Sequence, residues 1–245
     1  MKIACISDIH GNLHALDAVL ADIARRGADV IVNLGDILSG PLQPRATAER
    51  LMALDLPTVA GNHERQILAD DPARMGNSDR FARDAITPAQ RDWMRALPGT
   101  LRLVDDVLLV HGTPDSDVVC WLDSVSPAGR HAASHAEVHE RAGTAQASLI
   151  LCGHTHVPRS MQLDDGRLVV NPGSVGLQAY YDDHPFRHKM ENGTPHARYA
   201  IVERAGHTWT VEHRAVPYDW HAAAALAERH GRPEWGHALR TGRMP

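Results

Sequence analysis

Five short apolar runs, rich in β-branched residues, each end at a short polar sequence. Continuous apolar runs of this length are typical of strands that are buried on both faces. The pattern therefore predicts the central strands of an α/β protein. The runs are Lys2–Ser7, Asp29–Leu34, Leu56–Ala60, Val107–Val110 and Leu149–Cys152.

Apolar residues at helical spacing occupy segments between these runs. The spacing predicts helices over Asn12–Arg26 and Pro44–Leu54. A capping-box sequence with proline at the first helical position predicts another helix over Thr87–Leu97. Alternation of strand and helix implies parallel strand pairing with right-handed crossovers.

The later part of the chain predicts hairpins. Met161–Leu163 and Leu168–Val170 flank one turn sequence, and Arg198–Arg204 and Thr208–Arg214 flank another. A helix is expected over Trp220–His230. We predict one domain over residues 1–245, with a helical extension from about residue 216 to 245.

Three connections lack a clear periodic pattern. Gly112–Arg130 and Pro172–Ala197 are long, and long loops in compact domains are usually functional or disordered. The acidic stretch Ala69–Asp79 is interpreted as a solvated loop. Trp121, inside the first long connection, lies either beside a functional site or in the core.

Composition excludes several classes of protein. The chain is 43% apolar and 22% charged, as in soluble globular domains, and its apolar runs are far shorter than the roughly 20 residues of a membrane span. The N-terminal segment lacks the features of a secretory signal. A net charge of −5 disfavours loose binding to nucleic acid or anionic membranes. Cys5, Cys120 and Cys152 lack CxxC spacing and are expected to be reduced thiols in a cytoplasmic protein.

Side chains with metal-binding chemistry follow the ends of the predicted strands, where ligands bind in open α/β sheets. Carboxylate, amide and imidazole groups suit zinc, manganese, iron or nickel better than soft cuprous ion. Seven candidate ligands exceed what one tetrahedral site uses, so we predict two ions, with Asp36 as the ligand they share. The residues at this rim are Asp8, His10, Asp36, Asn62, His63, His111, His154 and His156.

Each of these short motifs has an ordinary alternative explanation. Asp8-x-His10 can be helix-capping chemistry, and Gly35-Asp36 and Asn62-His63 can be turn chemistry. Gly153-His154-x-His156 is more specific, because two imidazoles two residues apart can address neighbouring ions. The joint pattern, with every motif at a strand end, favours the metal site.

These motifs resemble those of the calcineurin-like metallophosphoesterases, most closely the small bacterial and archaeal branch. The resemblance runs from Met1 to about Gly176 and includes the N-terminal SDIHGN sequence. It implies an α/β fold, a four-layer α/β/β/α sandwich with two mixed sheets flanked by helices.

The resemblance also implies a role for each candidate residue. His63 would be the acid beside the leaving group, and Asn62 would also stabilise phosphoryl charge. A hydroxide that bridges the two ions would attack phosphorus in line. The first ion would be held by Asp8, His10, Asp36 and His156, and the second by Asp36, Asn62, His111 and His154.

Two positions depart from patterns in the family. The protein serine/threonine phosphatases carry Asp and Arg soon after the bridging aspartate, and Gly35–Pro41 has neither at those places. This argues against a phosphoprotein phosphatase and leaves the orienting partner of His63 unidentified. Glu64 stands where many relatives have Asp.

We expect substrate-binding residues in Pro172–Ala197. Within this segment, Tyr181, Arg187 and His188 form a cationic and aromatic set suited to a phosphorylated organic group. The alternative is a mobile, solvated loop. The turn Asn171–Ser174 precedes this segment and lies near the metals in the family.

A second group of histidines has a spacing that could provide a further metal site. His131, His135 and His139 would share one face of a helix, and we favour an exposed polar face over an extra site.

We therefore expect a cytoplasmic, binuclear metal-dependent phosphoesterase for a small phosphodiester or phosphomonoester. Its cofactors would be two divalent ions (Mn, Fe, Zn or Ni, with Mn best for activity), and its partner a small substrate rather than nucleic acid or membrane. A homo-oligomer is also compatible with the sequence. The alternatives are a nuclease, which usually needs a basic groove or DNA-binding extension, and a non-catalytic scaffold like the retromer subunit of this fold, which lacks the catalytic histidine.

Overall fold

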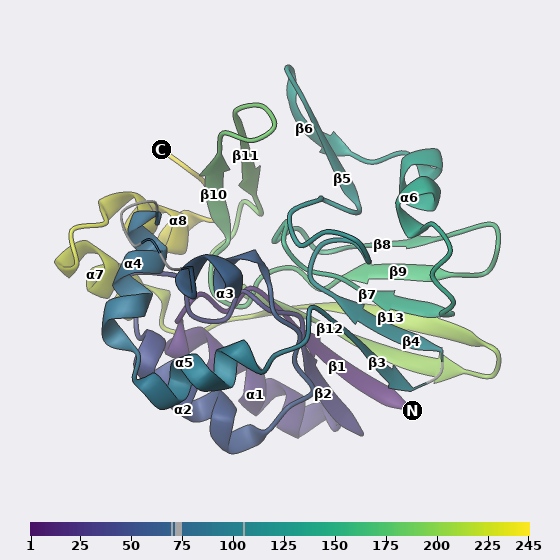
Figure 1. The fold of residues 1–245 in the computed structure, drawn as a ribbon, viewed down its shortest axis with the longest axis horizontal. Coiled ribbons are helices and arrows are strands. Elements are labelled where there is room, and N and C mark those ends of the chain that lie inside the picture. Colours follow the sequence, from purple (N-terminus) through teal and green to yellow (C-terminus); the bar gives the residue numbers. More distant parts are fainter. Residues whose placement is uncertain (70, 72–74, 105) are drawn as a thin grey trace.

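Two mixed β-sheets form the centre of the computed structural model, which describes residues 1–69, 71, 75–104 and 106–245 (Figure 1). The first sheet has the order β13–β12–β1–β2 and the second β3–β4–β7–β9–β8, and β10–β11 and β5–β6 form separate hairpins. The elements are β1 (Lys2–Ile6), α1 (Leu13–Arg26), β2 (Val30–Asn33), α2 (Pro44–Leu54), α3 (Asn62–Ile67), α4 (Asn77–Ala85), α5 (Pro88–Arg95), β3 (Thr100–Val104), β4 (Val107–Val110), β5 (Asp123–Ser126), β6 (Gly129–Ala132), α6 (His135–Ala142), β7 (Leu149–Leu151), β8 (Arg159–Gln162), β9 (Leu168–Asn171), β10 (Ala179–Asp182), β11 (His188–Glu191), β12 (Ala197–Ala205), β13 (Thr208–Val216), α7 (Trp220–Arg229) and α8 (Pro233–Thr241).

Strand β1 shows why the predicted apolar runs are unbroken. Ile3 and Cys5 pack into the cluster between the two sheets, whereas Ala4 and Ile6 pack into the cluster that contains α1. Both faces of the strand are therefore buried, and a polar residue would be costly on either. The same two clusters place the sheets face to face with helices outside, which confirms the four-layer sandwich.

The outer layers differ on the two sides of the sandwich. Helices α1, α2, α4 and α5 contribute to the cluster on the first sheet, and α6 covers part of the second. Trp121 is buried in the α6 cluster, and its Nε1 donates to the Val138 carbonyl at 3.1 Å. It therefore has the core role that the sequence left open.

Most predicted strands and both hairpins are confirmed, and β1–β2 and β4–β7 pair in parallel. The strand predicted over Leu56–Ala60 is wrong: the segment makes only an isolated bridge between Thr58 and Asn33. Pro57 has no backbone N–H to donate, which limits a strand of this length to a short contact.

The two long connections are not plain loops. The first contains β5 and the start of β6, and the second contains β10 and β11. His188 and Met190 of β11 are buried, so the alternative of a mobile, solvated loop is wrong for this hairpin.

The acidic stretch Ala69–Asp79 also differs from its prediction. Residues 70 and 72–74 lie outside the described residues, but α4 begins at Asn77 and Asp79 is buried. The solvated-loop interpretation is therefore wrong at Asp79.

The cysteines and helices agree with further expectations. Cys5, Cys120 and Cys152 are free thiols, and the first and last are buried. In the described part of the chain, no helix combines the length and apolar character that crossing a bilayer requires.

Candidate metal centre

The loops that carry the candidate ligands hold an unusual backbone conformation. Six non-glycine residues in the described ranges have positive φ angles, and all but Asp55 are candidate ligands. Such conformations cost roughly 1–3 kcal/mol each and concentrate at functional sites. The five ligands are Asp8 (54°), His10 (51°), Asp36 (53°), His154 (70°) and His156 (61°).

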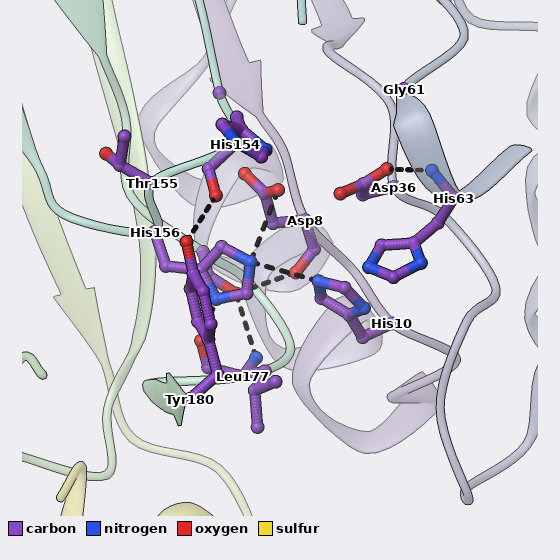
Figure 2. A network of polar contacts seen from close by, with 12 residues as sticks. Asp8, His10, Asp36, Gly61, His63, His154, Thr155, His156, Leu177 and Tyr180 are labelled. Carbon is purple, nitrogen blue, oxygen red and sulfur yellow. Dashed lines mark hydrogen bonds and ion pairs between the residues drawn. The ribbon is translucent and has the colours of Figure 1, made fainter. Parts of the chain in front are cut away.

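A first group of ligand atoms comes from the loop after β1 and the loop after β7 (Figure 2). Asp8, His10 and His156 together form a group that could hold an ion. Nε2 of His156 lies 3.4 Å from an Asp8 carboxylate oxygen and 3.0 Å from Nε2 of His10. All three side chains are almost completely buried.

A second group joins the ends of β2, β4 and β7. Asp36, His111 and His154 could hold another ion. Nε2 of His111 lies 3.1 Å from Oδ2 of Asp36 and 3.2 Å from Oδ1 of Asn62. The same amide oxygen lies 3.1 Å from Nδ1 of His154. The structure thus brings all seven predicted ligands into two adjoining groups, while the shared role of Asp36 stays a prediction.

The hydrogen bonds of the first group fit a bound cation. Nδ1 of His10 donates to the Ser39 carbonyl and Nδ1 of His156 to the Leu177 carbonyl, both at 2.7 Å. Because Nδ1 is the donor in both rings, their Nε2 atoms are the ones directed at each other, 3.0 Å apart. Both carboxylate oxygens of Asp8 are buried and without a hydrogen-bond partner. A divalent ion satisfies all of these donor atoms at once.

Burial and neighbouring charges shift the pKa values of His10 and His111 in opposite directions. Burial, followed by the neighbouring His156 and His63, lowers the pKa of His10 to about 3. Burial acts against the charged form of His111 as well, but the Asp36 carboxylate outweighs it and raises the pKa of His111 to about 10. The Asp36 carboxylate thus attracts positive charge, which a divalent ion would supply in place of the proton on His111.

His63 lies beside both groups and has a carboxylate partner. Its Nδ1 contacts Oδ1 of Asp79 at 2.7 Å, and Asp79 is buried on α4. Although burial disfavours the charged ring, Asp36 and Asp79 raise the pKa of His63 to about 9. The remaining nitrogen, Nε2, is the one available to the pocket that His63 lines. Asp79 is the orienting partner that sequence reasoning missed.

Glu64 holds the turn that presents Asp36. Its two carboxylate oxygens accept the backbone N–H groups of Asp36, Ile37 and Gly61, each at 2.8 Å. Asp36 in turn accepts the N–H of His63 at 2.9 Å (Figure 2). A side chain at Gly61 would place its Cβ 2.3 Å from Asp36, so only glycine allows this approach. The role of Glu64 is therefore to fix backbone around the site.

The Asn171–Ser174 turn lies against the ligand loops, as expected. Asn171 donates to the Gly153 carbonyl at 2.6 Å, and Ser174 donates to the Asp8 carbonyl at 2.7 Å. These bonds connect the loops after β1 and β7, so the turn stabilises the first ligand group without contributing a ligand.

A pocket of about 450 Å³ opens above the two ligand groups. One wall comes from α8 and the chain on either side of it, through Arg232, Trp235 and Met244. The opposite side includes Tyr180 and Tyr181 of β10. The hydroxyl of Tyr180 donates to the His154 carbonyl at 3.1 Å. Helix α8 lies within the helical extension predicted from about residue 216 to 245, but its own bounds and its place at the site were not predicted.

The predicted substrate-binding residues do not all reach this pocket. Tyr181 lines it, but Arg187 and His188 line a second hollow on the other side of Tyr181. His188 is buried, and its Nδ1 donates to the Phe186 carbonyl at 2.8 Å. The three residues are therefore neighbours but form no single set around the ligand groups.

The other histidine set is divided between two elements. His131 lies exposed on β6, so the helix predicted to carry it begins later, at His135. His135 and His139 stack on α6 and face Asp164 and Asp165 at 3.5 and 3.3 Å. The favoured exposed polar face holds for α6, but His131 is not part of it.

Comparisons with known proteins agree with this geometry. The sequence model of the calcineurin-like phosphoesterase superfamily domain matches residues 1–193. An uncharacterised protein of Methanocaldococcus jannaschii is 27% identical over 265 residues, covering 98% of both chains. A metallophosphoesterase structure from Sphaerobacter thermophilus has a TM-score of 0.76 at 25% identity, covering 99% of this chain and 100% of that one. A hypothetical protein structure from Pyrococcus horikoshii has a TM-score of 0.76 at 19% identity, over 100% and 99% of the two chains, which shows a shared fold.

Proposed function

This chain belongs to the calcineurin-like phosphoesterase superfamily, and from that premise we propose that it hydrolyses a small phosphodiester or phosphomonoester with two divalent metal ions. One observation carries the proposal: His10 and His156 of the first ligand group, Asp36 and His154 of the second, and His63 all line the same pocket of about 450 Å³. A pocket of that volume suits a small ester.

The positions of the carboxylate, amide and imidazole groups indicate which residues would hold each ion. Asp8, His10 and His156 would hold the first, Asn62, His111 and His154 the second, and Asp36 would be shared between them. Bound divalent ions supply charge stabilisation for a phosphoryl group and lower the pKa of a coordinated water. We propose manganese as the ion that supports activity best.

His63 would protonate the leaving oxygen. Its Nδ1 is held by Asp79, so the ring presents Nε2 to the pocket in a fixed orientation. A positioned acid of this kind contributes typically 10²–10⁴-fold to the rate. The Oδ1 atom of Asn62 faces the two histidines, which leaves its Nδ2 to donate to a phosphoryl oxygen.

A screen on aryl esters tests this proposal. Metal-stripped protein is refilled with manganese, iron, zinc or nickel and assayed on aryl phosphomonoesters and phosphodiesters. We expect hydrolysis with at least manganese. The absence of hydrolysis with every metal would favour the protein-binding scaffold.

The His63→Ala variant tests the proton donor. We expect it to retain the metal content of the parent by elemental analysis while kcat falls about 10²–10⁴-fold. The loss should be largest for alkyl esters, whose leaving groups need the proton most. Full activity of this variant on an alkyl ester would remove His63 from the mechanism.

A further inference from the structure

A second hollow adjoins the pocket of the metal centre. It has a volume of about 510 Å³ and lies between the β10–β11 hairpin and the turn of the β5–β6 hairpin. Tyr181 lines both cavities. In Figure 1 the β10–β11 hairpin stands between α8, which walls the first pocket, and the β5–β6 hairpin. A ligand that passes Tyr181 therefore reaches both cavities.

The second hollow is cationic although the whole chain has a net charge of −5. Its lining includes Arg130, Arg187 and Lys189 against a single carboxylate, that of Glu191. Glu191 pairs with Lys189 at 3.0 Å, and Arg130 pairs with buried Asp123 at 2.9 Å. Within the described residues, Arg187 has no carboxylate within salt-bridge distance. Its guanidinium lies 5.7 Å from the centre of the Tyr181 ring.

The first pocket offers no comparable free cation at its rim. Among its described lining residues, the one arginine is Arg232, which pairs with Glu234 and donates to Ser78 at 3.1 Å. A second anionic group on the substrate would therefore find its counter-charge beyond Tyr181. A guanidinium is suited to that role because its planar donors match phosphate oxygens.

We propose that the hollow between the two hairpins binds a second phosphate of the substrate, held by Arg187, with Lys189, which remains paired with Glu191, adding positive charge beside it, while the scissile phosphate lies at the metal centre. This inference rests on the proposed phosphoesterase function. It assigns the substrate to extended phosphoesters that carry at least two phosphates. The ring of Tyr181 orients Arg187 and separates the two phosphate positions.

Equilibrium dialysis tests the subsite without catalysis. Inorganic tripolyphosphate and inorganic phosphate are dialysed against metal-free protein, as the parent, the double variant Arg187→Gln/Lys189→Gln, and the control Arg45→Gln. Arg45 is an exposed arginine on α2, paired with Glu49, so the control removes a surface cation elsewhere. We expect the double variant to weaken tripolyphosphate binding about tenfold, the equivalent of one good charged contact. An equal effect of the double variant and the control would overturn the subsite.

Kinetics on matched substrates then distinguish the source of the second phosphate. Phenyl triphosphate is compared with phenyl phosphate, and the p-nitrophenyl ester of thymidine 5′-phosphate is compared with and without a 3′-phosphate. The pair that shows the larger gain in kcat/KM identifies a phosphate chain or a sugar phosphate. In the double variant that gain in kcat/KM should fall about tenfold, mainly through a higher KM. The Arg45→Gln control should retain the gain of the parent. A gain that survives in the double variant overturns the subsite.

Failure of the parent on every ester would refute the proposed function, while the dialysis still decides the subsite.

Discussion

Left-handed backbone at Asp8, His10, Asp36, His154 and His156 requires local support, because each such residue costs free energy. The support is visible around Asp36, where Glu64 accepts three backbone N–H groups. A carboxylate is needed there, since an amide has only one acceptor oxygen. The two carboxylate oxygens of Glu64 thus reach three donors at once.

Glu64→Gln tests this support. One or two of the three backbone N–H groups would face an amide NH₂, so we expect the free energy of unfolding to fall by about 2 kcal/mol. Metal affinity should fall about 10- to 100-fold, as when an outer partner of a ligand is lost. Urea denaturation and metal titration measure the two effects. Glu49→Gln, on an exposed pair with Arg45, is the control and should change stability by less than about 0.5 kcal/mol. Equal behaviour of the two variants would contradict the role of Glu64.

Asp79→Asn tests the partner of His63. The neutral amide orients the ring less well and no longer stabilises its charged form, so kcat should fall about tenfold or more with metal content retained. Steady-state kinetics on esters with good and poor leaving groups measure the effect. Asp84→Asn, on the same helix but exposed, is the matched control. A loss independent of the leaving group would argue that Asp79 is only structural.

The candidate ligands could be predicted from the sequence, whereas Asp79 could not. Every candidate ligand except Asn62 stands in a short motif after a strand that the structure confirms, so the strand pattern predicts that these ligands meet. Asp79 stands in no motif and does not follow a strand, and it reaches His63 only because α4 packs against α3. Such a contact depends on tertiary packing, which single-sequence patterns do not encode.

At the scale of elements, α1 is fastened to the first sheet by a buried charge. Asp22 on α1 accepts the hydroxyl of Tyr199 on β12 at 2.7 Å and pairs with Arg25 and Arg26. Burial alone would raise the pKa of Asp22, but hydrogen bonds from Arg26, Tyr199 and Arg25 lower it to about 2. The unfolded value is about 3.9, so ionised Asp22 stabilises the fold.

Asp22→Asn should therefore cost stability in a pH-dependent way. The contribution is fully present above pH 4 and is lost as the pH falls from about 4 to about 2. We expect the variant to lose about 2 kcal/mol at pH 7 and distinctly less at pH 3, measured by urea denaturation. Asp17→Asn, an exposed residue of the same helix, should show no such trend. A deficit that is the same at both pH values would contradict this account.

The elements themselves were predictable where both faces of a strand are apolar, as in β1 and β4. Prediction failed where the signal was short or mixed. Leu56–Ala60 contains a proline, and β10 and β11 bury only some of their residues and pair only with each other. The helix α8 has a buried face made partly of Trp235 and Gly236, which lacks the aliphatic spacing seen in α1.

At the scale of the whole molecule, the metal centre joins loops from both sheets. Ligands of the first group come from β1 of one sheet and β7 of the other, so a bound ion links the two halves of the sandwich. An ion that binds only the folded state stabilises the whole domain by mass action.

Removal of the metals should lower the thermal midpoint. At a metal concentration about 100-fold above Kd, binding contributes about 3 kcal/mol, which corresponds to a Tm difference of about 5–10 °C for a chain of this size. Calorimetry with manganese and with chelator measures it. Asp36→Asn should bind at least one metal equivalent fewer by elemental analysis and show a smaller shift. Two equivalents in that variant would contradict the shared role of Asp36.

The order of these parts along the chain has a consequence for synthesis on the ribosome. All seven candidate ligands precede residue 157, whereas β12, which pairs with β1, and α8, which walls the pocket, follow much later. A nascent chain thus exposes metal-binding side chains before the wall that confines the substrate exists. The confinement that this wall provides would therefore be acquired only when the last helix docks.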